Sequence, residues 1–125
     1  MRKVFFIILY FVFCISCKKD KHQDNSSVEL KIIKPTANQV FSVNDTIIFE
    51  FEASNKREFH GYEFRILSLP TKKVIKIHGE HLHQKNISKT YMWRSDSLGK
   101  MQFEVKVLID HKGNFKMDTV NFEVQ

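Results

Sequence analysis

The fold is decided by the stretch Met101-Gln102-Phe103-Glu104-Val105-Lys106-Val107-Leu108-Ile109-Asp110. Its apolar side chains recur at every second position, and mostly polar residues stand between them. Successive side chains of a β-strand point to opposite faces of a sheet, so this pattern predicts a strand with one face in a hydrophobic core. An amphipathic helix would repeat its apolar residues every three or four positions instead.

The same period of two continues outward from this stretch in both directions. We expect strands over residues 28–34, 47–51, 62–66, 74–78, 87–93, 101–109 and 120–124. Turn-forming residues such as Pro70, Gly99 and Gly113 separate them, and no segment shows a helical stripe. About seven short strands in about 100 residues predict an all-β fold, an immunoglobulin-like antiparallel β-sandwich over residues 28–125.

A family resemblance supports this fold class. The order Ile33-Lys-Pro35, Phe41, Asp45-Thr-Ile47, Trp93, Gly99 and Asp110-His-Lys-Gly-Asn114 resembles bacterial immunoglobulin-like domains over residues 28–125. The antibody cysteine pair is missing from this region. The resemblance implies a spacer, an adhesion module or a ligand binder, because such domains serve several roles on one fold.

The first residues carry a targeting signal. Arg2 and Lys3 precede a 12-residue apolar run, Val4 to Ile15, which is too short for the roughly 20 residues that span a bilayer. The following Cys14-Ile-Ser-Cys17 resembles the lipobox of bacterial lipoproteins, which implies cleavage after residue 16 and lipids on Cys17. Residues 1–16 are therefore expected to be a signal peptide, and residues 17–27 the lipidated cysteine and a flexible polar tether.

The tether and the domain together resemble small envelope lipoproteins of Bacteroidota. The mixture of Lys and Asp after Cys17, with His60-Gly-Tyr62, His81-Leu-His83 and Trp93, carries this likeness. It implies anchoring at the outer membrane, on its periplasmic face or at the cell surface, and it supplies no activity. The expected partners are the membrane and possible outer-membrane protein complexes, and the domain is expected to be monomeric.

Charge and cysteine usage exclude several function classes. Without Arg2 and Lys3 the chain keeps 18 of its 20 basic residues against 14 acidic ones, a net charge of +4. Basic and acidic residues are interleaved, so no nucleic-acid-binding face is expected. Lipid on Cys17 and loss of Cys14 leave no thiol for a disulfide or a cysteine metal site. No nucleophile elbow or phosphate-binding loop occurs, so we expect no enzyme.

The histidines form the one constellation with possible chemistry. Five lie in the domain, at His60, His78, His81, His83 and His111. If the strands run up and down, all five arrive at one end of the sandwich. His81 and His83 would project the same way if the chain between them is extended, roughly 7 Å apart at the backbone.

Two interpretations of these histidines stay open. In the first, His81 and His83 bind Zn(II) or Cu(II), His78, His60 or His111 supplies a third ligand, and Asp110 or Glu80 acts as a further or supporting group. The protein would then be a non-enzymatic module that captures a transition metal. In the alternative, the histidines are ordinary rim and surface residues, and the domain is a structural or interaction module without a metal site.

Overall fold

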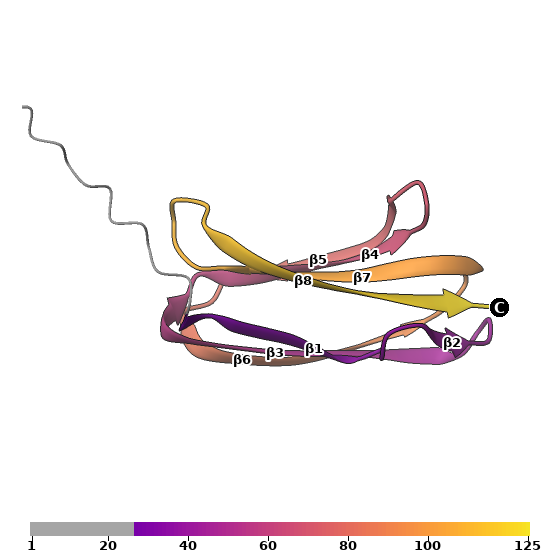
Figure 1. Cartoon of the computed structure of the whole chain (residues 1–125), viewed down its shortest axis with the longest axis horizontal. Helices are drawn as coiled ribbons and strands as arrows, with labels where there is room; N and C mark the ends of the chain where they lie inside the picture. Colours follow the sequence, from indigo (N-terminus) through magenta and orange to yellow (C-terminus); the bar gives the residue numbers. More distant parts are fainter. Residues whose placement is uncertain (1–26) are drawn as a thin grey trace, which may run out of the picture.

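The computed structural model describes residues 27–125, which form two β-sheets packed face to face (Figure 1). The predicted signal peptide, Cys17 and nearly all of the tether lie outside the described residues. The eight strands are β1 (Glu29–Lys34), β2 (Gln39–Phe41), β3 (Thr46–Phe59), β4 (Gly61–Ser68), β5 (Lys73–Glu80), β6 (Gln84–Arg94), β7 (Gly99–Leu108) and β8 (Phe115–Val124). Within residues 27–125 no helix has the length and apolar character to cross a membrane.

The two sheets differ in size. One has three strands in the order β1-β3-β6, and the other has five in the order β2-β8-β7-β4-β5. All pairings are antiparallel except β2 with β8, which is parallel. The predicted immunoglobulin-like sandwich is confirmed. The expectation of seven strands missed β2, because three residues are too few to show a period of two.

The core lies between the sheets and is centred on aromatic rings. Phe49 is 1% exposed, and its ring centroid lies 4.7 Å from that of Phe103, 5.6 Å from Phe122 and 6.4 Å from Trp93. The apolar positions of β7 from Met101 to Val107 are fully buried, as their alternation predicts. Removing such side chains from water is the main favourable term in folding.

Side chains of β8 close one side of the sandwich against β1. Lys116 Nζ donates to the carbonyl oxygen of Val28, and Asp118 Oδ2 accepts from the backbone N–H of Ile32 at 3.3 Å. Just before β1, Ser27 Oγ donates to Asn55 Oδ1 at 3.0 Å. The chain therefore enters the sandwich beside the last part of β3, at the left end in Figure 1.

Candidate functional site

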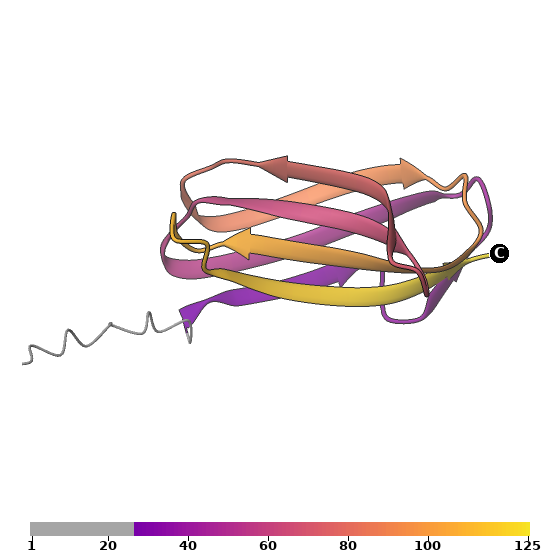
Figure 2. The ribbon, with the colours of Figure 1, turned by 90° about the horizontal axis from the view of Figure 1, so that it is seen from above.

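Three chain reversals meet at the end of the sandwich where the chain enters. Here β3 turns into β4, β5 into β6, and β7 into β8 (Figures 1 and 2). His60 lies in the first reversal, His81 and His83 in the second, and His111 in the third. We call this end, defined by these four imidazoles, the histidine end.

The four rings lie close together although they come from distant parts of the sequence. The ring centroid of His60 is 3.9 Å from that of His111 and 4.9 Å from that of His83. His81 is 4.8 Å from His83 and 6.5 Å from His111. The antiparallel topology brings these loops together, as the up-and-down reasoning predicts for these four residues.

His78 does not belong to this cluster, so the prediction that all five histidines converge was wrong. Its ring lies 5.5 Å from Phe64, 6.2 Å from Tyr62 and 6.2 Å from Tyr91, to which it is stacked. His78 sits two residues before the end of β5, opposite Phe64 in the ladder. Its ring lies against these aromatic side chains of β4 and β6 and is not part of the loops that carry the other four histidines.

His81 and His83 are the closest polar pair of the cluster. Their Nε2 atoms are 3.0 Å apart, so one ring donates a proton and the other accepts it. Leu82 between them is 8% exposed and belongs to the core, which fixes the loop. Two nitrogen atoms at this separation can share a proton or a bound cation.

His60 is the most enclosed member of the cluster. Its Nδ1 atom is buried and has no hydrogen-bond partner within residues 27–125. Burial lowers the pKa of His60 below its usual 6.5, and the charges of His111, His83 and His81 lower it further, while Asp110 opposes them. The ring is therefore held toward its neutral form.

A glycine next to His60 allows two strands to approach each other closely. Gly61 has a φ of 144°, and a β-carbon there would lie 2.6 Å from the carbonyl oxygen of Glu80. The end of β5 therefore approaches the start of β4 so closely that only glycine fits without a shift of the backbone. The motif His60-Gly-Tyr62 is visible in the sequence, but nothing in it predicts this close approach.

The two carboxylates predicted to support a metal have other partners. Asp110 accepts hydrogen bonds from the N–H of Lys112 at 2.9 Å and from Asn114 Nδ2 at 2.6 Å, and the bonds from Asn114 are the main cause of its lowered pKa. Glu80 accepts from Lys89 Nζ at 2.8 Å and from the Tyr62 hydroxyl at 3.0 Å, which lowers its pKa. Burial, together with Glu80, raises the pKa of Tyr62 to about 12.

A cavity of about 690 Å³ opens beside His60 and His111. Its lining includes four cationic side chains that the sequence analysis did not single out, Lys56, Arg57, Lys85 and Lys112. Three residues of the lining come from an irregularity in β3, whose register with β6 jumps from Ser54 to Phe59. Bulges of this kind often bend a strand at a binding site, and they leave no pattern in the sequence.

The geometry of the histidines supports the metal hypothesis only in part. Within residues 27–125, no group of three or more His, Cys, Asp or Glu side chains is positioned to hold a metal ion. The His81 and His83 pair is close enough for two ligands of one ion, and the other rings are near but not aligned with it. The assignment of these histidines to Zn(II) or Cu(II) stays a prediction.

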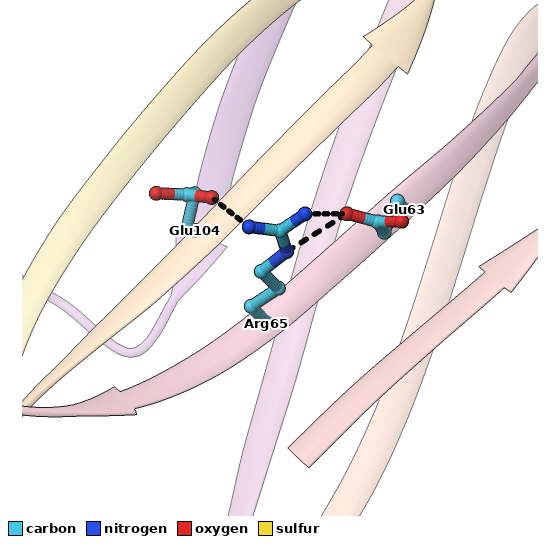
Figure 3. Close-up of polar contacts among 3 residues, drawn as sticks. All are labelled: Glu63, Arg65 and Glu104. Atoms are coloured by element: carbon cyan, nitrogen blue, oxygen red, sulfur yellow. Dashed lines mark hydrogen bonds and ion pairs between the residues drawn. The ribbon is translucent and has the colours of Figure 1, made fainter. Parts of the chain in front are cut away.

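The outer face of the five-stranded sheet shows how charges are arranged elsewhere in the domain. Arg65 lies between two acids there, with Nη2 at 2.6 Å from Glu63 Oε1 and Nη1 at 4.0 Å from Glu104 Oε1 (Figure 3). The ion pairs within residues 27–125 also use Lys34 and Lys89, and none of them uses a cation of the cavity.

Comparison with known proteins supports the fold. No protein-family model matches the chain, and no curated protein matches it. It is similar to the fibronectin(III)-like modules of CbhA from Clostridium thermocellum, at 13% identity and a TM-score of 0.54, over 77% of this chain and 94% of that one. It is also similar to a CARDB domain from Pyrococcus furiosus, solved in complex with di-metal ions, at 17% identity and a TM-score of 0.51, over 79% and 86%. At these identities the likeness shows the fold alone, a single immunoglobulin-like domain.

Proposed function

We propose that this chain is a non-enzymatic binding module, tethered to the bacterial outer membrane through lipids on Cys17, and that the histidine end is its binding surface. One observation supports the choice of surface above all others. Loops from three separate reversals bring four imidazoles together at one end, next to a cavity of about 690 Å³. Loops held by a rigid scaffold are the usual place for binding residues.

The first candidate ligand is a transition metal bound by His81 and His83. The separation of 3.0 Å between their Nε2 atoms favours it, since both nitrogen atoms can turn toward one ion. The remaining ligands would come from His60, His111 or water. A thiol-free, histidine-based site suits Zn(II) or Cu(II).

Calorimetric titration of residues 18–125 with Zn(II) and with Cu(II) tests this candidate. This piece includes all eight strands and the whole core, so it contains the complete fold. We expect binding tighter than about 10 µM, a dissociation constant that corresponds to about −7 kcal/mol. His81→Ala with His83→Ala should abolish the binding.

The matched control is His78→Ala, which removes an imidazole outside the histidine end and should leave the binding unchanged. Absence of binding by the wild type, or equal loss in the control, would remove the metal candidate.

The second candidate is an interaction module without a metal. The edge strands are β1 and β6 in one sheet and β2 and β5 in the other, and each pairs on one side only, which leaves backbone donors and acceptors for a partner strand. If an outer-membrane protein cross-links to wild type and to the His81→Ala, His83→Ala variant in equal yield, this candidate is favoured over the first.

A further inference from the structure

The cavity at the histidine end carries an excess of positive charge. Four basic side chains and two carboxylates contribute to its lining, namely Lys56, Arg57, Lys85 and Lys112 against Glu58 and Asp110. Asp110 already accepts hydrogen bonds from Lys112 and Asn114 within its own turn. The lining therefore favours an anion over a cation.

The cations are brought together by folding and have no ion-pair partner in residues 27–125. Lys56 and Arg57 come from the irregular end of β3, Lys85 from the start of β6, and Lys112 from the turn between β7 and β8. Elsewhere Lys34, Arg65 and Lys89 form ion pairs, and other basic residues stand unpaired but do not line this cavity. Four like charges left together mark a place for an external counter-charge.

A second observation at the same place concerns His60, which lines this cavity. Its Nδ1 atom is buried without a hydrogen-bond partner in the described part of the chain. A buried polar atom without a partner costs free energy, and that cost would be removed if the His60 ring turned so that this nitrogen met an oxygen atom of a group bound in the cavity. Phosphate oxygens accept hydrogen bonds from lysine, arginine and imidazole donors alike.

The path of the chain indicates where such phosphates would be. Ser27 contacts Asn55 beside this end, so the predicted tether leaves from the side of the domain that carries the cavity. Residues 18–27 can span at most about 35 Å when fully extended. Ser27 therefore stays within that reach of the membrane, if Cys17 is lipidated as proposed above, and the cavity lies at the same end of the domain.

We propose that the cavity at the histidine end binds the phosphate groups of anionic lipid headgroups, and so docks the domain onto the membrane that carries its tether. The lipids on Cys17 would hold the protein at the membrane, and the cations would set which end of the sandwich faces it. Basic side chains near an anionic membrane surface each add to binding, and salt weakens the attraction.

Vesicle co-sedimentation of residues 18–125 tests the proposal without relying on the lipid anchor. We expect binding to mixed phosphatidylglycerol and phosphatidylcholine vesicles at low salt, its loss at about 0.5 M salt, and none to phosphatidylcholine alone. Replacing Lys56, Arg57, Lys85 and Lys112 with Gln should weaken binding by up to about a thousandfold. These four side chains are exposed, so the fold should survive. If the fourfold variant did not fold, the double variant Lys85→Gln with Lys112→Gln would be measured in the same vesicle experiment.

The matched control removes the same charge from the remainder of the sandwich, by Lys73→Gln, Lys76→Gln, Arg94→Gln and Lys100→Gln. It should bind anionic vesicles as well as wild type. Equal loss in both fourfold variants would overturn the proposal, because net charge alone would explain the binding. Absence of wild-type binding would overturn it as well. Binding to heparin or inorganic phosphate but not to vesicles would overturn the lipid proposal and identify the ligand as a soluble anion.

The tether is tested separately. The intact mass of the full chain isolated from cell envelopes shows whether Cys17 carries lipids. A missing lipid would contradict the proposed anchoring and leave the vesicle result unchanged. Failed vesicle binding by residues 18–125, when the full chain is found to carry lipids, would contradict the docking proposal alone.

Discussion

Two clusters of aromatic rings in this domain are built in opposite ways. The rings around Phe49 come from strands whose registers are fixed by backbone hydrogen bonds, and they are buried on all sides. The rings of the histidine end come from the reversals between strands and stand at the rim, where one buried nitrogen has no partner in residues 27–125. The first cluster stabilises the fold, and the second is available to a ligand because the first already holds the strands.

The largest expected effect on stability comes from a substitution that disrupts the core cluster. Phe49→Ala removes a ring that contacts three other aromatic residues, so we expect a loss of about 3–5 kcal/mol in the free energy of unfolding. Urea unfolding followed by tryptophan fluorescence measures it. Met92→Ala, at a side chain that is 66% exposed, should change the free energy by no more than about 0.5 kcal/mol. Similar losses in both variants would mean that the core is not centred on Phe49.

A smaller effect is expected at Gly61, the neighbour of His60 at the histidine end. Gly61→Ala forces a β-carbon against the Glu80 carbonyl oxygen, in a backbone conformation that favours glycine, and should cost about 1–3 kcal/mol. Gly113→Ala is the matched control, because Gly113 also has a positive φ but no atom within 4 Å of the added carbon. Thermal unfolding should rank Gly61→Ala as the less stable variant. The reverse order would contradict the close approach of β5 to β4.

The smallest effect should appear in the pH dependence of stability. The folded protein holds the pKa of His60 below 6.5, so the unfolded chain binds more protons and stability falls as pH drops below 6.5 toward the folded pKa. Burial is the largest cause of this lowered pKa, the charges of His111, His83 and His81 add to it, and Asp110 opposes it. We expect the melting temperature to fall as the pH is lowered from 7.5 to about 5.5.

His60→Gln should reduce this acid-induced decrease, because the side chain that must stay neutral in the fold is gone. This pH range lies above the titration of the carboxylates. Glu80 and Asp110 have lowered pKa values in the fold, so their contributions to stability are lost only as the pH falls below the ordinary carboxylate pKa near 4. An equal decrease in wild type and variant would show that other groups cause the pH dependence.

Sequence reasoning worked best where one rule applied along a whole segment. The alternation in residues 101–109 placed Met101, Phe103, Val105 and Val107 in the core, and all four are fully buried. It failed at β2, which is held to β8 by a short parallel pairing rather than by its own pattern. It also placed His78 with the other histidines. The order of strands predicts which end of the sandwich a strand runs toward, but it does not predict where the strand ends, and His78 lies within β5 rather than in the loop after it.

The candidate site was only half visible in the sequence. Histidines stand out by their rarity, so His60, His81, His83 and His111 could be named in advance. Lys56, Arg57, Lys85 and Lys112 could not, because they are interleaved with other residues along the chain and come together only through three reversals. An even mixture of charges along a sequence does not predict an even mixture on the folded surface.

The sequence by itself determined the fold class, since side-chain alternation sorts each strand into a buried and an exposed face whatever its neighbours are. It also limited the side chains that could hold a metal in the described domain to imidazole and carboxylate groups, because no cysteine lies in residues 27–125. Only the tertiary structure decided which of these groups meet. The irregularity in β3, the close approach at Gly61 and the three loops set those distances, and each depends on contacts between residues far apart in the chain.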